Sequence, residues 1–312
     1  ARVPSVSGIL LVWALAGLIT LAGALICAEL ASTFSESGGV YVYLREAFGP
    51  SLGFLWGWAM FWSMHSGIIA AIAVVFARYA GALIPLGATA STAVAIAAII
   101  LLSLVNHFGV GLGSRLQAVF TVGKLLAVIV IVSMGLLLGG QIDSHFVGPA
   151  AGAGSIGAGD ILAGLAAGLF AFGGWHMVTY SAEETVEPKR TIPRALLLGT
   201  AIVTMVYIAM NAVYLYVLPL DKVAGSTRVA ADLAETLLGA VGAKAISALV
   251  MASAFGALAG IVLAGPRVYL AMARDGLLFR AVGAIHPKYL TPYRAIWLQA
   301  VWASVLVATG TF

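Results

Sequence analysis

Charged residues are scarce in this chain. They make up 9% of its 312 residues, whereas hydrophobic residues make up 62%. Soluble domains carry about 25% charged and about 45–50% apolar residues. A chain with so little charge cannot cover a water-exposed surface, so the composition excludes an ordinary soluble protein and indicates an integral membrane protein.

Cysteine and catalytic motifs are also lacking. Cys27 is the single cysteine, which excludes an intramolecular disulfide. The sequence has no His/Cys/Asp cluster with metal-ligand spacing, no P-loop and no Gly-x-Ser-x-Gly elbow. We therefore expect no enzyme, no metal and no cofactor. The net charge of +4 does not indicate nucleic acid, because the basic residues lie in short loops between apolar runs.

Long apolar runs are what the sequence does contain. Eight of them are long enough to span a bilayer as helices, with a short amphipathic piece, Val40–Phe48, after the first and a polar, interfacial helix, Val229–Leu238, before the seventh. The pattern predicts an all-α membrane protein with one transmembrane domain over residues 1–312. The eight runs are Val6–Phe34, Leu52–Tyr79, Thr89–Val105, Leu116–Leu138, Ile161–Ala182, Ala195–Leu218, Ala245–Met272 and Ala295–Thr309.

Basic residues alternate between the loops. The positive-inside rule places the more basic set of loops in the cytoplasm, and both ends of the chain then lie outside. We expect from this that further helices precede and follow these residues. The cytoplasmic set holds Arg45, Arg115, Lys189, Arg190, Arg194, Arg274, Arg280, Lys288 and Arg294; the opposite set holds Arg2, Arg78, Lys222, Arg228 and Lys244.

The fifth run contains a weak point near mid-membrane depth, Gly173-Gly174. Each glycine weakens a helix by about 1 kcal/mol relative to alanine. Inside lipid, the freed backbone groups must face protein, water or a ligand. A broken helix there would suit a small zwitterion; the alternative is a glycine-lined packing surface between helices. Aromatic side chains flank the two glycines: Phe170, Phe172 and Trp175.

Lys124 is the most deeply placed cation. It lies eight residues beyond Leu116, roughly 12 Å along a helix axis. An intramembrane charge is a functional candidate, although a lysine can also extend its stem to the interface. His65 is expected to be a hydrogen-bonded core residue, and Arg267 to cap its helix or to pair with a carboxylate such as Glu183.

The run 183–190, Glu-Glu-Thr-Val-Glu-Pro-Lys-Arg, follows the weak point directly. Such a run is usually a solvated loop. Its position after a broken helix leaves open that it forms a cytoplasmic gate.

The motifs together resemble a known family, the amino-acid permeases of the amino acid–polyamine–organocation superfamily, and most closely its L-type amino-acid transporter branch and bacterial members. Four stretches carry the resemblance, in the right order and over nearly the whole chain. They are Ala28-Glu29-Leu30 with residues 37–44; Phe120-Thr121 with Lys124-Leu125-Leu126; residues 170–175 with Glu183-Glu184 and residues 188–193; and Arg267 with residues 273–276 and His286-Pro287.

The resemblance implies the inverted-repeat (LeuT-like) secondary-transporter fold, with twelve helices built on two five-helix repeats. The eight apolar runs then correspond to helices two to nine, and the first helix and helices ten to twelve lie outside this sequence. Because the first helix of the family holds the substrate carboxylate, the resemblance implies that these residues alone neither bind nor transport substrate.

The resemblance also implies roles for residues at the weak point. Phe170 would be the aromatic gate above the substrate. The backbone of Ala171, Phe172 and Gly173 would meet its amino group, because the carbonyl end of a broken helix carries partial negative charge. Trp175 would pack beneath the break.

A second implied site lies around Lys124. Its ammonium would stand where sodium-coupled relatives hold a sodium ion, which implies sodium-independent transport, and Ser253 is expected to face it. The loop Gly81–Gly87 has no cysteine, so no disulfide-linked subunit is expected.

The hypothesis is therefore a multi-pass cell-membrane permease. It would move amino acids, neutral ones being favoured, by alternating access as an exchanger or a proton-linked carrier. A polyamine or amine permease of the same superfamily and a transport-dead amino-acid sensor are the alternatives. An intramembrane enzyme ranks low because no catalytic set exists.

Overall fold

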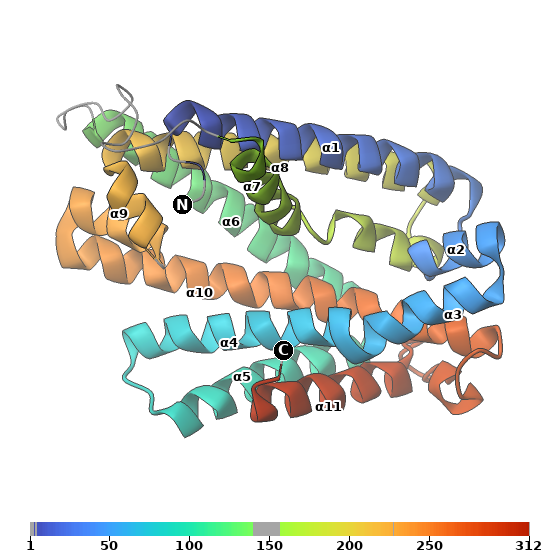
Figure 1. Ribbon diagram of the computed structural model, residues 1–312. Coiled ribbons are helices and arrows are strands. Elements are labelled where there is room, and N and C mark those ends of the chain that lie inside the picture. Colours follow the sequence, from blue (N-terminus) through green and yellow to red (C-terminus); the bar gives the residue numbers. More distant parts are fainter. Residues whose placement is uncertain (1–2, 4, 140–156, 227, 312) are drawn as a thin grey trace. The chain divides into compact units, whose positions relative to one another are not determined.

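A computed structural model describes residues 3, 5–139, 157–226 and 228–311. The described residues form helices joined by short turns (Figure 1). The chain divides into two compact units, which we describe separately. Unit 1 comprises Ala1–Ile26, Leu125–Trp175 and Arg194–Ile246, and unit 2 comprises Cys27–Lys124, His176–Pro193 and Ser247–Phe312.

Several helices, α5, α6, α8, α10 and α11, extend beyond the runs that the sequence predicts, and one short element, η1, is a π-helix. In chain order the elements are α1 (Val6–Thr33), α2 (Val40–Phe48), α3 (Pro50–Ala59), η1 (Met60–Met64), α4 (His65–Leu83), α5 (Ala88–His107), α6 (Val110–Leu138), α7 (Ala158–Ala171), η3 (Trp175–Glu184), α8 (Pro188–Val217), α9 (Leu220–Gly225), α10 (Val229–Arg274), η4 (Arg280–Gly283) and α11 (Tyr293–Thr309).

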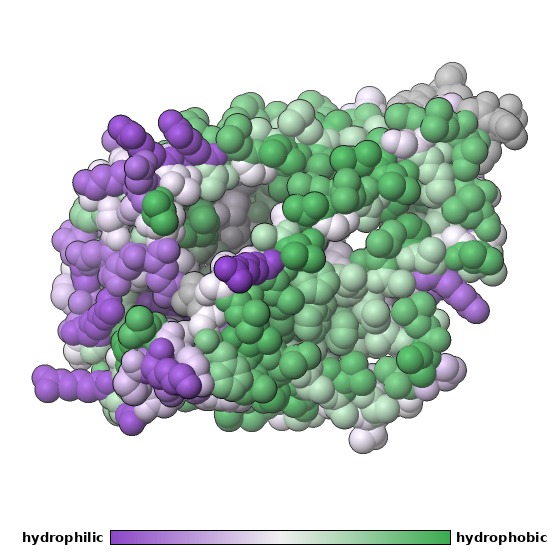
Figure 2. Space-filling view, turned by 180° about the vertical axis from the view of Figure 1, so that it is seen from behind, coloured by the Kyte–Doolittle hydropathy of each residue, from purple (hydrophilic) through white to green (hydrophobic). Residues whose placement is uncertain are grey.

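Seven helical stretches of the described residues are long and apolar enough to cross a membrane. The eighth predicted run forms α11, which has 17 residues. Hydrophobic side chains cover most of the helical surface, and hydrophilic side chains gather at the end that bears α2 and the loop after α10 (Figure 2). These features confirm the prediction of an all-α membrane protein.

The predicted helix bounds agree best with the structure where polar residues or glycines interrupt the apolar pattern. α2 has the predicted bounds, and the predicted interfacial helix is the first part of α10, separated from the rest by Gly239 at φ 68° and ψ −161°. α6 and α8 begin six and seven residues before the predicted runs, because their first turns are polar. Most of the predicted loop Gly139–Gly159 lies outside the described residues.

The main core of unit 2 is formed by α4, α5, α11 and the second half of α10. Ile69, Ile99, Leu102, Leu258 and Val262 are its large, fully buried side chains. Alanines fill much of the remaining contact surface. Small residues let helix backbones approach closely, which is how helices associate where lipid supplies no hydrophobic driving force.

Unit 1 uses the same device between α1 and α7. Gly164 and Gly168 are four residues apart on α7, and they face Val12 and Ala16 on α1. A Cβ atom on Gly168 would lie 3.1 Å from that of Ala16. This contact holds the end of α7, and therefore the start of the weak point, against α1.

Candidate functional site

The helix is broken at the two glycines, as the sequence predicts. α7 ends at Ala171, Gly174 has a φ of 97°, and the 3₁₀-helix η3 begins at Trp175. The φ of Gly174 is one that residues with a side chain rarely adopt. The amide of Gly173 donates to the carbonyl of Phe170 at 3.0 Å, so α7 closes with one tight turn before the chain changes direction.

The aromatic side chains on the two sides of the break differ in exposure. Phe172 is buried against Trp13 and Tyr207, with ring centroids 6.2 and 4.9 Å away. Phe170 is 84% exposed. Trp175 is half-buried and lies against Gly23 of α1. One aromatic ring thus fixes the end of α7, while the Phe170 ring remains available to contact another group.

Tyr207 is a residue of the break that sequence reasoning missed. Its hydroxyl donates to the carbonyl of Ala171 at 2.9 Å, which is the last carbonyl of α7. A carbonyl oxygen has two lone pairs, so the bond leaves capacity for a second donor. Tyr207 lies within the apolar run of α8, where only its contact with the break distinguishes it from a packing residue.

The N-terminal half of α6 runs along α10 in unit 2. Side-chain atoms of Gln117 meet Gly260, and one turn further on Phe120 meets Gly256. The steps along the two helices have opposite directions, so the helices are antiparallel here. One turn further along α6, the same register places Lys124 at the level of Ser253 in α10. Both residues are half-buried.

A buried ion pair joins the end of η3 to α10. The guanidinium of Arg267 is 1% exposed and binds both carboxylate oxygens of Glu184, at 2.9–3.2 Å. The sequence suggested Glu183 as the partner of Arg267, which is wrong. Glu184 pairs with Arg267 because Glu183, one residue earlier in η3, points toward Arg274. A carboxylate oxygen of Glu183 lies 2.9 Å from the Arg274 guanidinium.

The segment that follows α1 packs on η3. The amide of Ser37 donates to Glu183 at 3.2 Å, and the amide of Gly38 donates to the carbonyl of Tyr180 at 3.1 Å. Gly39 has a φ of 52°, and a Cβ atom there would collide with Thr179. Glycine is therefore required at this position. Three motifs far apart in the sequence thus meet at η3, and we call them the η3 network: Ser37-Gly38-Gly39, Glu183-Glu184 and Arg267 with Arg274.

α2 is tied to the residue that follows α10. The Asp275 carboxylate accepts hydrogen bonds from Arg45 and from the Tyr41 hydroxyl, the latter at 2.6 Å. Burial and this bond to a carboxylate raise the pKa of Tyr41. Burial raises the pKa of Tyr43 to about 12, against a smaller opposite effect of its hydrogen bond with Thr179. Both hydroxyls therefore stay protonated at neutral pH and can donate.

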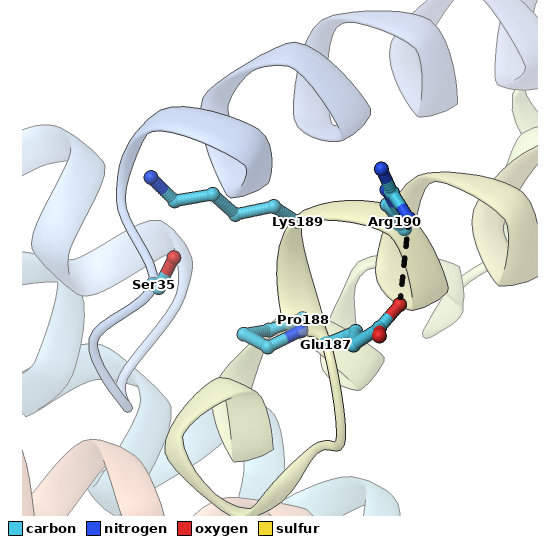
Figure 3. Close-up of a pocket in the computed structure, with 5 residues that line it drawn as sticks. All are labelled: Ser35, Glu187, Pro188, Lys189 and Arg190. Carbon is cyan, nitrogen blue, oxygen red and sulfur yellow. Dashed lines mark ion pairs between the residues drawn. The ribbon is translucent and has the colours of Figure 1, made fainter.

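The last part of the acidic and basic run is solvated. An open pocket of about 330 Å³ lies beside the start of α8. Figure 3 shows Lys189 extending toward the Ser35 segment and the ion pair of Arg190 with Glu187, at 3.9 Å. Both charged groups are largely exposed, and such pairs contribute about 0–1 kcal/mol. Only the first two residues of the run, Glu183 and Glu184, have the fixed partners that a gate would need.

His65 is fully buried, as expected of a core residue, but neither of its ring nitrogens has a hydrogen-bond partner among the described residues. This corrects the expectation of a hydrogen-bonded histidine. The ring faces Gly265 together with the Gln299 side chain, and it lies edge-on to Tyr180 at 6.3 Å. Among the described residues no group of three or more His, Cys, Asp or Glu side chains could hold a metal ion.

Comparisons with known proteins agree with this architecture. The sequence model of the amino acid permease family matches residues 1–311. The serine/threonine exchanger SteT of Bacillus subtilis is 35% identical over 301 residues, which are 96% of this chain and 68% of that protein. Human large neutral amino acids transporter small subunit 2 is 33% identical over 98% of this chain and 58% of its own length. Human b(0,+)-type amino acid transporter 1 is 32% identical, over 96% and 62% respectively.

We expect the Arg267–Glu184 pair to matter far more for stability than the neighbouring Arg274–Glu183 pair. Glu184→Ala leaves a buried guanidinium unpaired, which costs about 3–5 kcal/mol. Arg274→Ala removes a pair that is about half exposed, which costs about 1 kcal/mol or less. Thermal unfolding of the two variants in the same detergent measures the difference. Equal shifts in the unfolding temperature would show that Arg267 finds another partner.

Proposed function

Because the chain belongs to the amino acid permease family, we propose that it carries amino acids across the membrane by alternating access. The family and the seven apolar helices make it a multi-pass protein of the cell membrane. The observation on which the proposal depends is the broken helix at Gly173-Gly174, which presents backbone groups and an exposed aromatic ring together. Discontinuous helices of this kind form the substrate sites of many secondary transporters.

The chemistry of the break fits the amino end of a zwitterion. The carbonyl end of α7 carries partial negative charge, and the Ala171 carbonyl keeps a free lone pair beside the bond from Tyr207. We propose that Ala171, Phe172 and Gly173 bind the substrate ammonium through their backbone. Phe170 would then cover the substrate, and Trp175 would support the break from η3.

Neutral amino acids are the substrates that we favour. The break has no charged side chain of its own between Gly168 and Tyr180, so a charged substrate side chain would find no partner on this segment. The names of two relatives, a serine/threonine exchanger and a large neutral amino acids transporter, support the same choice.

Lys124 is proposed to take the place of a bound cation. The register of α6 against α10 favours an arrangement in which its ammonium faces Ser253. A fixed positive charge there would make a sodium ion unnecessary, so we propose sodium-independent exchange or proton-linked transport. We also propose that no disulfide-linked subunit is required, because Cys27 lies within α1.

Counterflow tests the function. We expect proteoliposomes of the full-length protein, preloaded with unlabelled serine, to accumulate labelled serine, and empty proteoliposomes not to accumulate it. An exchanger requires a counter-substrate, whereas binding without flux would indicate a sensor. Counterflow driven by putrescine but not by serine would indicate an amine permease.

Gly173→Leu tests the site. A leucine side chain would stand where the substrate must approach the backbone, and its Cβ would lie 3.0 Å from the Phe170 carbonyl. We expect serine binding to be lost while the protein still inserts and elutes as a single species. Gly159→Leu is the matched control, because Gly159 lies exposed on α7 with no atom near its missing Cβ. Unchanged affinity in Gly173→Leu would remove the break from the substrate site.

Lys124 variants test the cation substitution. We expect uptake to be the same in sodium and in choline, Lys124→Ala to lose most transport, and Lys124→Arg to recover only part of it because the guanidinium is planar and larger. Lys222→Ala, at an exposed lysine of α9, is the control. Near wild-type transport by Lys124→Ala would show that this lysine only reaches to the interface.

A further inference from the structure

An apolar cavity of about 290 Å³ opens on unit 2, and none of the residues that line it belongs to the proposed substrate or cation sites. Its walls come from α3, η1, the end of α10, the turn around η4, and α11. The cavity lining is aromatic and aliphatic, and several of its side chains are exposed at the mouth: Trp58, Trp62, Phe279, Leu298 and Val301.

The π-helix η1 fixes one wall of this cavity. A π turn inserts an extra residue and frees backbone carbonyls. The Phe61 carbonyl accepts the Ser66 hydroxyl at 2.6 Å, and the Trp62 carbonyl accepts the indole N–H of Trp302 at 2.9 Å. The second bond joins η1 to α11 across the cavity, so the cavity is a fixed feature of the packing between these elements.

The occupant must be apolar. Trp58 and Trp62 at the mouth belong to a helical stretch of membrane-spanning composition, Pro50–Leu83, and the lining offers hydrocarbon and ring faces. A polar ligand would lose its hydration here without new hydrogen bonds, at a cost of roughly 2–7 kcal/mol for each polar group. An acyl chain of the surrounding lipid has no hydrogen bonds to give up on entering and pays only for its ordering.

Two arginines stand at one rim. Arg280 lies on η4 between the lining residues Phe279 and Val282, and Arg294 reaches the same turn by donating to the Ala281 carbonyl at 3.3 Å. Both are exposed, and neither forms an ion pair with a carboxylate of the described residues. This rim belongs to the loop after α10, which the positive-inside rule places in the cytoplasm.

We propose that this cavity binds one acyl chain of an anionic phospholipid of the cytoplasmic leaflet, whose phosphate is held by Arg280 and Arg294. The apolar walls select a hydrocarbon chain, and the two unpaired guanidinium groups at the rim select a negative headgroup. A guanidinium matches the geometry of phosphate oxygens and can bind two of them at once. The site is a structural lipid site, separate from the proposed substrate site at Gly173-Gly174.

Native mass spectrometry of the delipidated full-length protein tests the headgroup. We expect phosphatidylglycerol to bind more tightly than phosphatidylcholine with the same chains. Arg280→Gln and Arg294→Gln should each weaken phosphatidylglycerol about fivefold, the factor that corresponds to one basic side chain near an anionic lipid surface, and leave phosphatidylcholine unchanged. Lys288→Gln is the control, because this exposed lysine of the same loop lies over Tyr289 and is not bonded to the turn.

A second pair of variants tests the acyl chain. Leu298→Trp fills the cavity from its mouth and should release phosphatidylglycerol, whereas Val305→Trp, on the same helix but outside the lining, should not. If Leu298→Trp does not fold, quenching of tryptophan fluorescence by phosphatidylglycerol with brominated chains replaces it. Quenching should exceed that by brominated phosphatidylcholine in the wild type, and the excess should disappear in Arg280→Gln.

Three results would overturn the proposal. Equal binding of the two lipids would mean that they form only the ordinary shell around the protein. Full competition by glycerophosphoglycerol, which has the headgroup without chains, would mean that the rim binds phosphate and the cavity is not used. Arginine variants with wild-type lipid binding would place the anion elsewhere.

Discussion

The requirement that every backbone polar group be satisfied inside hydrocarbon governs this structure. Two departures from a regular helix, the break and the π turn, have side-chain partners for carbonyls that they free. At the break, Tyr207 bonds the last carbonyl of α7. At the π turn, Ser66 and Trp302 bond the carbonyls of Phe61 and Trp62. Both places carry exposed aromatic side chains, Phe170 at 84% and Trp62 at 40%; the break is the one that we propose as the substrate site.

The η3 network fixes the position of η3, which a broken helix cannot do by itself. A broken helix has lost the stiffness that would hold its second half in place. Two arginines of α10 hold the end of η3 through Glu183 and Glu184, and the turn at Ser37-Gly38-Gly39 holds it from the other side. The charges are therefore structural in the first place. Glu183, Glu184 and Arg274 lie at helix ends, whereas Arg267 is buried two turns inside α10 and is paired there by Glu184.

Composition and glycine placement predicted the helices, the amphipathic α2, the interfacial helix that forms the start of α10 and the break, because each depends on local residue types. Sequence reasoning could not predict η1, since a π turn has no local signature here. It paired Arg267 with the wrong neighbour of two adjacent carboxylates, because which of them faces α10 depends on the rotation of η3. Sequence reasoning missed Tyr207 for a similar reason, because its role depends on a contact between helices. The functions of Phe170, Lys124 and Ser253 stay predictions.

The chain passes between its two units five times, and the crossings differ in local helix structure. Two fall inside helices without proline or glycine beside the crossing, at Ile26/Cys27 and Ile246/Ser247; one, at Lys124/Leu125 in α6, adjoins Gly123; and one follows Pro193 in α8. The fifth follows the break. Intact helices curve gently, whereas sharp kinks need proline, an inserted residue or a missing bond. The crossings at Pro193 and at the break therefore have local features that permit a sharp change of direction, whereas the crossings inside α1 and α10 lie in continuous helix.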